Sequence, residues 1–218
     1  MAKIILCPGH GGSDPGAIKN IREADFNYSF ARHILSSIQG LSGDGVIVGS
    51  EGGVSDAVKK ANAYGKDAVL LSIHANCCGG TGYESYYAEG YYSGKTRELV
   101  DGVHAAYAPS GLKNRGIKSD KTTRFGRLGI LRDTKMPATL IECGFVDNDA
   151  ALLADQGFQV RMGDAIARAL MKIAGQTVHE PVAPQPTPQP ALQPAPAPGI
   201  HLTDAEIEKV RKVLSYFA

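Results

Sequence analysis

Two histidines and two glutamates stand at positions where an α/β protein could assemble a reactive site. His10 lies in a glycine-rich segment, while His74 and Glu142 each close an apolar run. Glu23 stands at the start of a helical pattern. A carboxylate that ends a strongly apolar run needs either a partner or a chemical task, because burying an unpaired charge is costly. Together the four residues offer two imidazoles and two carboxylates.

This set of groups is typical of a catalytic zinc site. Two imidazole nitrogens and one carboxylate oxygen can hold the ion and leave its fourth position open for water. The other carboxylate can then act as a general base toward that water. Taken singly, each residue has a simpler interpretation: a strand-end histidine can be structural, and Glu23 can be a first-turn acid favoured by the helix dipole. The glycine-rich turn lacks the spacing of a phosphate-binding loop.

The elements that would position these residues alternate between strand-like and helix-like segments. In open α/β sheets, functional groups collect where the carboxyl ends of the strands meet the loops. We therefore predict an α/β domain over residues 1–176, with a mostly parallel sheet covered by helices. The expected strands are 3–7, 45–49, 68–74, 83–88, 127–131 and 138–143, and the expected helices are about 23–38, 54–64, 93–107, 149–154 and 157–174.

A proline-rich segment follows this domain. Residues 180–199 read EPVAPQPTPQPALQPAPAPG, a composition that favours extended polyproline II and cannot form a sheet ladder. We predict a linker over residues 177–200 and a terminal segment, residues 201–218, that holds one amphipathic helix of about 204–217. Thr203 and Glu206 predict a capping box at its start. Because so short a helix is marginal alone, we expect its apolar face to dock, to self-associate or to contact a wall or membrane surface.

The composition narrows the classes of function. The chain has 218 residues and a formal net charge of +1, so it lacks the basic excess expected of a nucleic-acid-binding protein. No apolar stretch approaches the ~20 residues that a membrane helix requires, and we predict no transmembrane segment. The amino terminus lacks the basic and apolar regions of a signal peptide, which predicts synthesis in the cytoplasm.

The four cysteines show no disulfide framework. Cys77 and Cys78 are adjacent, while Cys7 and Cys143 fall in expected strands, so no spaced pairing pattern is present. We therefore expect four reduced, structural thiols, as in a reducing compartment.

Five ordered blocks of sequence carry a resemblance to a known family. The blocks are GHGGSDPGA (9–17), READFN (22–27), SIHAN (72–76), NRGIKSD (114–120) and LRDTKMPATLIECGFVDN (131–148). They resemble the zinc-dependent N-acetylmuramoyl-L-alanine amidases of the third amidase class, which include bacterial autolysins and phage endolysins. The resemblance covers residues 3–174 and implies a central six-stranded, twisted sheet with helices on both faces.

The resemblance also implies roles for individual residues. It makes His10, Glu23 and His74 the ligands of Zn2+, with Glu142 as the catalytic base. Three further residues match positions that imply substrate contacts, although both arginines could equally be solvated surface residues: Asn76, Arg115 and Arg132.

The implied reaction is hydrolysis of the amide bond between N-acetylmuramic acid and L-alanine in peptidoglycan. Without a signal peptide, such an enzyme would act on the bacterial cell wall only after release, which favours a phage or prophage endolysin. Two alternatives stay open: a non-catalytic peptidoglycan-binding module of the same fold, and another zinc hydrolase such as a wall carboxypeptidase or deacetylase. Product analysis separates these, because an amidase exposes a new alanine amine.

Overall fold

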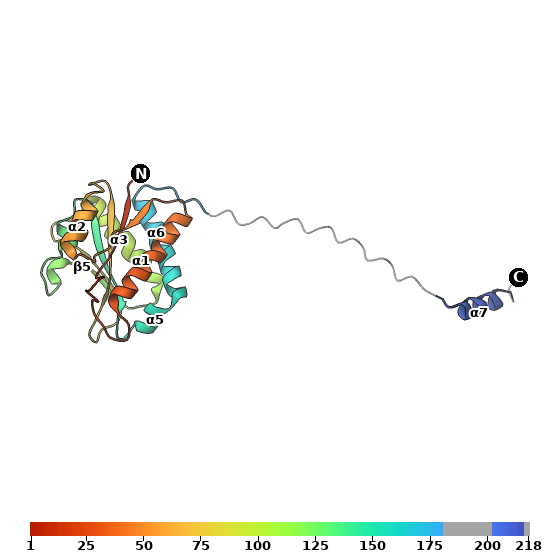
Figure 1. The fold of residues 1–218 in the computed structure, drawn as a ribbon. Helices are drawn as coiled ribbons and strands as arrows, with labels where there is room; N and C mark the ends of the chain where they lie inside the picture. Colours follow the sequence, from red (N-terminus) through yellow and green to blue (C-terminus); the bar gives the residue numbers. More distant parts are fainter. Residues whose placement is uncertain (181–201, 216–218) are drawn as a thin grey trace. The chain divides into compact units, whose positions relative to one another are not determined.

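The computed structural model describes residues 1–180 and 202–215. The chain divides into two compact units, Met1–Pro181 and Val182–Ala218, and the first contains the whole sheet (Figure 1). Most of the predicted linker, from residue 181 onward, lies outside the described residues. No helix in the described ranges is long and apolar enough to cross a membrane.

The first unit is built on one six-stranded sheet in the order β2-β1-β3-β6-β4-β5. Neighbouring strands run parallel except β4 and β6, which are antiparallel. The predicted α/β class, with a mostly parallel sheet, is therefore confirmed. The strands are β1 (Ile4–Pro8), β2 (Gly45–Ile47), β3 (Val69–Asn76), β4 (Tyr83–Tyr87), β5 (Asn114–Ser119) and β6 (Ala138–Phe145).

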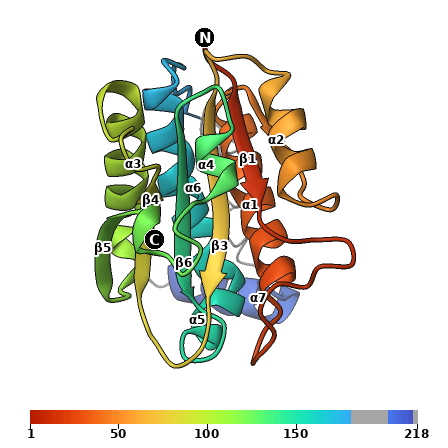
Figure 2. The ribbon, with the colours of Figure 1, turned by 90° about the vertical axis from the view of Figure 1, so that its left-hand side faces the viewer.

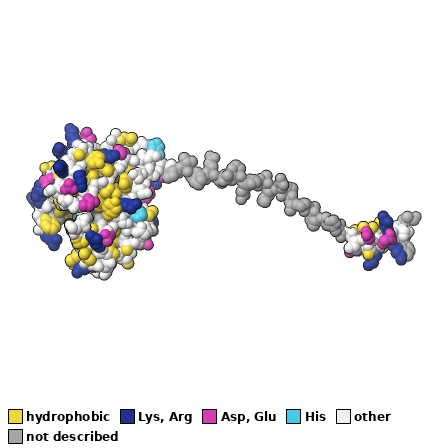
Figure 3. Space-filling view, viewed as in Figure 1, with side chains coloured by type: hydrophobic (Ala, Val, Ile, Leu, Met, Phe, Trp, Pro, Cys, Tyr) yellow, Lys and Arg dark blue, Asp and Glu magenta, His cyan; other side chains and the backbone are white. Residues whose placement is uncertain are grey.

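Helices cover both faces of this sheet (Figure 2). One face packs against α1 (Glu23–Gly40), α3 (Gly94–Tyr107) and α6 (Gln156–Ile173), and the other packs against α2 (Val54–Asn62) and α4 (Gly129–Arg132). The shorter elements are α5 (Ala150–Ala154) and the 3-10 turns η1 (Ala108–Ser110) and η2 (Asp120–Thr122). Figure 3 shows basic and acidic side chains interspersed over the visible face of this unit.

The apolar runs of the central strands divide between two cores. Ile4 and Leu6 of β1 face the core beneath α1, α3 and α6, whereas Ile5 and Cys7 face the core beneath α2 and α4. This follows from the two-residue period of a strand, which sends successive side chains to opposite faces. A strand buried on both faces must be apolar throughout, as β1 is.

One predicted strand is wrong and one strand was missed. Residues 127–131 were expected to form a strand, but α4 begins at Gly129, and its Ile130 and Leu131 pack into the core beneath α2 and α4. The sixth strand is instead β5, which is largely polar and lies at the edge of the sheet. An edge strand needs little apolar sequence, since only one neighbour and part of one face cover it.

The cysteine prediction is also partly wrong. Cys7 and Cys143 are free and buried, but Cys77 and Cys78 form a disulfide between adjacent residues. A search for spaced pairs excludes adjacent partners from the start, which is why the sequence pattern did not predict it. The pair lies in the connection between β3 and β4.

The second unit contains α7 (Asp204–Leu214), close to the helix predicted for residues 204–217. The predicted capping box is present, because Thr203 N donates to Glu206 Oε2 at 2.8 Å. Its apolar residues Ile207, Val210, Val213 and Leu214 are all exposed within the described part of the chain. Self-association through this helix stays a prediction.

Candidate metal centre and active site

The carboxyl ends of β1, β3 and β6 lie together at one end of the sheet (Figure 2). We call this row of strand ends the active edge, which is distinct from the lateral edge formed by β5. His10 follows β1 in the loop that leads to α1, and Glu23 is the first residue of α1. His74 on β3 lies directly beside Glu142 on β6 in the strand register. The structure thus brings the four predicted residues together from four separate elements.

Glu23 lies between the two histidines. Its Oε1 is 3.2 Å from Nε2 of His10 and 3.0 Å from Nδ1 of His74, and the imidazole centroids are 5.1 Å apart. One nitrogen or oxygen from each of these three residues lies within 4.8 Å of the others. Two imidazoles and one carboxylate around a common point fit a divalent metal ion that accepts nitrogen and oxygen ligands.

Further contacts hold these three side chains in place. Asp14 Oδ2 lies 2.8 Å from Nδ1 of His10, on the side of the ring opposite Glu23. The Ala17 amide donates to Glu23 Oε2 at 2.9 Å, and buried Asn27 donates to the Gly9 carbonyl at 2.9 Å. A carboxylate behind a ligating histidine orients the ring and raises its basicity, which is the arrangement that Asp14 provides.

The pKa values of His10 and Glu23 depend strongly on each other. Hydrogen bonding to Glu23, aided by Asp14, raises the pKa of His10 to about 9. Burial of Glu23 acts to raise its pKa, but the hydrogen bonds with His10 and His74 outweigh burial and lower it. Without a metal ion, a proton on His10 therefore supplies a positive charge that balances the carboxylate of Glu23.

Two glycines leave the space that the side chains of His74 and Glu23 occupy. A Cβ atom at Gly9 would lie 2.0 Å from the His74 ring, and one at Gly16 would lie 2.6 Å from Glu23 Oε2. Gly16 also has a φ of +64°, in the left-handed region that favours glycine. His10 itself has a φ of 67°, an unfavourable conformation for a residue with a Cβ and one that clusters at functional sites.

Glu142 differs from Glu23 in its hydrogen bonding. Its Oε2 atom is buried without a hydrogen-bond partner in the described residues. Burial, followed by the charges of Glu23 and Glu84, raises its pKa well above the ordinary value for glutamate. A carboxyl group with a raised pKa beside a metal-binding set can accept a proton and return it, as acid–base catalysis requires.

Glu84 lies opposite Glu142 on β4 and is the centre of a polar cluster. It is only 3% exposed, and its carboxylate accepts hydrogen bonds from four side chains: Asn76, Tyr86, Arg115 and Lys118. Burial opposes its ionisation, but the hydrogen bonds from Lys118 and Arg115 outweigh burial and lower its pKa to about 2. Two residues predicted to contact substrate, Asn76 and Arg115, therefore lie beside the active edge in this cluster.

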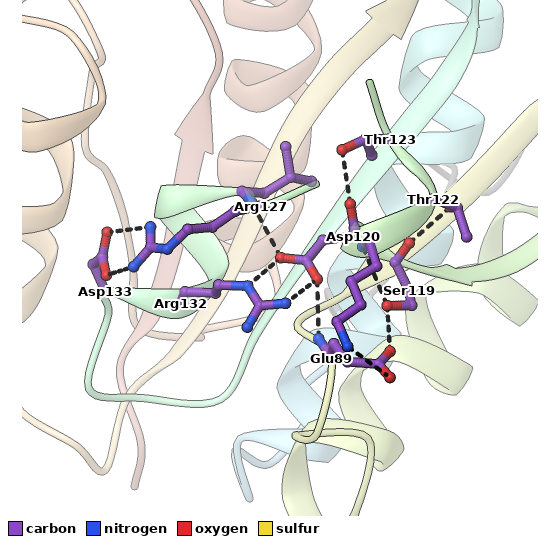
Figure 4. Close-up of polar contacts among 10 residues, drawn as sticks. Glu89, Ser119, Asp120, Thr122, Thr123, Arg127, Arg132 and Asp133 are labelled. Carbon is purple, nitrogen blue, oxygen red and sulfur yellow. Dashed lines mark hydrogen bonds and ion pairs between the residues drawn. The ribbon is translucent and has the colours of Figure 1, made fainter. Parts of the chain in front are cut away.

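Arg132 is placed differently from the other predicted residues. It donates from Nε and Nη2 to the carboxylate of Asp120, both at 2.6 Å, and Asp120 is fully buried (Figure 4). The same carboxylate accepts the backbone amides of Glu89 and Leu128. Asp120 follows β5, whose Ser119 pairs with Tyr87 at the far end of β4 from Glu84. The structure does not bring Arg132 to the active edge.

A cavity of about 780 Å³ opens beside His10. It lies on the β1 and β2 side of the metal-binding set, between the exposed side of α1 and the loop after β2. Its lining includes the polar side chains of Arg22, Tyr28, Arg32 and Glu51. The active edge thus has an open cavity on one side and the Glu84 cluster on the other.

A family model described as N-acetylmuramoyl-L-alanine amidase matches residues 4–172. The chain belongs to this amidase family. Its first unit therefore carries an amidase catalytic domain, and the fold agrees. The catalytic domain of CwlV, an N-acetylmuramoyl-L-alanine amidase from Bacillus (Paenibacillus) polymyxa var. colistinus, superposes with a TM-score of 0.68 at 30% identity, over 79% of this chain and 97% of that one.

Relatives of the amidase domain include phage and bacterial proteins. An endolysin of Bacillus phage SPP1 is 32% identical over 187 residues, which cover 79% of this chain and 66% of the relative. The N-acetylmuramoyl-L-alanine amidase CwlM of Bacillus licheniformis is 35% identical over 170 residues, covering 72% and 63%. The chain thus spans less than two thirds of the length of either relative.

Sequence reasoning missed several residues that organise this amidase site. Asp14 lies in the segment GHGGSDPGA, and its position four residues after His10 in a turn is a signal that could have predicted its contact with His10. Glu84 and Lys118 were also missed. The argument that singled out Glu142, a charged residue inside a buried strand, applies equally to Glu84 and would have found it.

Proposed function

We propose that this amidase domain hydrolyses the bond between N-acetylmuramic acid and L-alanine in peptidoglycan, using Zn2+ held by His10, Glu23 and His74. The observation that carries the proposal is the convergence of these three side chains within 4.8 Å, beside a glutamate with a raised pKa. Membership of the amidase family supports the choice of bond and substrate.

The metal and the chain would divide the chemistry between them. A bound zinc ion supplies Lewis acidity toward the amide carbonyl and lowers the pKa of water in its open position. Glu23 and the two histidines hold the ion, and Asp14 orients His10 through Nδ1.

Glu142 would move the proton in both halves of the reaction. Its carboxylate accepts a proton from the attacking water and then donates that proton to the leaving amine of L-alanine. The raised pKa makes Glu142 a stronger base than an exposed carboxylate for the first step, and the proton that it gains there supplies the second step. Glu84 cannot take this role, since four hydrogen-bond donors keep it ionised.

The test compares wild type with Glu142→Ala on purified peptidoglycan. We expect wild type to release peptides that begin with a new alanine amine, detected by mass, and to bind one zinc ion. Glu142→Ala should bind zinc equally and be inert, whereas Glu98→Ala, at an exposed glutamate of α3, should behave as wild type. Acetate release or cleavage within the peptide would instead indicate a deacetylase or carboxypeptidase. Binding without cleavage by wild type would indicate a non-catalytic module.

For the biological setting we propose an endolysin, which acts on the cell wall after release. A relative named as an endolysin of a Bacillus phage supports this choice. The prediction to test is lysis from without: purified protein added to susceptible cells should lower the turbidity of the suspension, and Glu142→Ala should not.

A further inference from the structure

A bulge in β5 turns two cationic side chains toward one carboxylate. In a regular strand Arg115 and Lys118, three positions apart, would point to opposite faces of the sheet. Here the pairing advances two positions along β4, from Tyr83 to Ser85, but three along β5, from Asn114 to Ile117. Gly116, with a φ of +90°, lies within this extra step. Both side chains consequently reach Glu84.

The cluster carries more positive than negative charge. Arg115 donates from Nε to Glu84 Oε2 at 2.9 Å, and Lys118 binds the same oxygen. In the described chain, neither terminal nitrogen of Arg115 has a protein acceptor, and its guanidinium stacks 4.9 Å from the centroid of the Phe145 ring. The two cationic side chains are 31% and 32% exposed, so their remaining donors are open to a ligand.

The distance between the Glu84 cluster and the metal-binding set matches the length of a few residues of an extended peptide. Glu84 pairs with Glu142 across β4 and β6, and Glu142 pairs with His74 across β6 and β3. At about 4.8 Å between strands, the backbone of Glu84 is about 10 Å from that of His74. An extended peptide advances about 3.5 Å per residue. Side chains reaching outward from this cluster can therefore contact a substrate group one or two residues from the bond that is cut.

We propose that Arg115 and Lys118 form a subsite for a carboxylate of the stem peptide, carried by the residue that follows the L-alanine. This inference rests on the proposed amidase function. Glu84 is a positioning residue: it fixes both cations yet neutralises only one of them, which leaves a net positive charge for the ligand. A guanidinium with free terminal nitrogens and an ammonium group together provide charge-assisted hydrogen bonds of the kind that carboxylates accept.

The experiment uses the full chain and two soluble substrates. Both are N-acetylmuramoyl tripeptides whose second residue is a glutamate joined to the third residue through its side-chain carboxyl group, and they are identical except that its α-carboxyl group is free in one and amidated in the other. We expect wild type to cleave the free acid with a kcat/KM about tenfold higher, the effect of one charge-assisted hydrogen bond. In Lys118→Met the ratio should fall to about one through a loss on the free acid alone, whereas structural damage would slow both substrates equally.

Three further variants make the result specific. Lys118→Arg should keep the preference, and so should Lys121→Met, which changes an exposed lysine bound to Glu89. Arg32→Met tests whether an arginine of the cavity beside His10 binds the substrate carboxylate instead. Equal wild-type rates on the two substrates would overturn the subsite alone, as would a preference lost in Arg32→Met and kept in Lys118→Met. Failure of wild type to cleave either substrate would overturn the proposed function and this inference with it.

Discussion

Glu84 and Glu142 are direct cross-strand partners on β4 and β6, yet their carboxyl groups have opposite surroundings. Four side chains donate hydrogen bonds to Glu84, whereas the buried Oε2 of Glu142 has no partner in the described residues. Two negative charges facing each other would repel. The difference in surroundings resolves the conflict, since Glu84 holds the charge and Glu142 is free to hold a proton.

Glu84→Gln should therefore change how stability depends on pH. Because the folded pKa of Glu84 is about 2 and the ordinary value is 4.5, its contribution to the free energy of unfolding is present above pH 4.5. That contribution is lost as pH falls toward 2. We expect the variant to be about 3 kcal/mol less stable at pH 7, with a shallower loss between pH 4.5 and 2. Urea unfolding across this range measures both, with Glu98→Gln as the exposed control; parallel curves for Glu84→Gln and wild type would contradict the assignment.

Metal binding should release a proton from His10. In the metal-free protein the pKa of His10 is raised to about 9, so at pH 7 the ring is protonated and the metal must displace that proton. Zinc affinity should rise about tenfold per pH unit from pH 7 to 8 and level off above pH 9. Calorimetry in buffers of different ionisation enthalpy measures the proton release directly. Asp14→Asn, which removes one cause of the raised pKa, should release fewer protons; a wild-type release of zero at pH 7 would refute this prediction.

Gly9→Ala should strongly weaken metal binding while leaving the fold in place. The new Cβ would lie 2.0 Å from the His74 ring, which must then leave its position beside Glu23. We expect zinc affinity to fall at least 100-fold, in line with the cost of disturbing groups around a metal site. Gly40→Ala is the matched control, because a Cβ there meets nothing within 4 Å. Far-ultraviolet circular dichroism of wild type and both variants checks that the fold is unchanged. A normal zinc affinity in Gly9→Ala would show that metal binding does not need the His74 ring in its present position.

Asp120 and Arg132 should matter for stability more than for substrate. Asp120 is fully buried and accepts four hydrogen bonds, two of them from Arg132 (Figure 4). We expect Asp120→Asn to lower the free energy of unfolding by about 3–5 kcal/mol, because it leaves the arginine without its charge partner. Asp133→Asn, at a half-exposed pair with Arg127, should cost under about 1 kcal/mol. The KM of Arg132→Met distinguishes a structural role from a substrate contact. A large rise in KM without a loss of stability would support the predicted contact between Arg132 and substrate.

The sequence predicted best those features in which burial leaves a pattern. The central strands are apolar on both faces, so β1, β3 and β6 were placed within a few residues, and a glutamate in such a strand was conspicuous. The four candidate residues could be singled out because His10, His74 and Glu142 lie in or just after such strands and Glu23 begins the first helix. The antiparallel direction of β4 left no comparable pattern in its short, tyrosine-rich sequence.

The features that escaped prediction depend on contacts between distant segments. β5 is polar because it lies at the sheet edge, and its bulge at Gly116 is visible only against the register of β4. The Glu84 cluster draws its donors from Asn76 and Lys118, which lie on different strands. The position of Arg132 required the fold of residues 120–132, where an apolar run forms a helical turn instead of a strand.

The antiparallel direction of β4 has a consequence for the segment that connects it to β3. Since β3 ends and β4 begins at the active edge, residues 77–82 pass over the end of β6 between them, where Gly79 and Gly80 are held by Asp147 and Asn148. A crossover to another parallel strand would have to return to the opposite edge. The chain between β3 and β4 therefore needs no crossover, and a change in its length would leave the order and direction of the strands as they are.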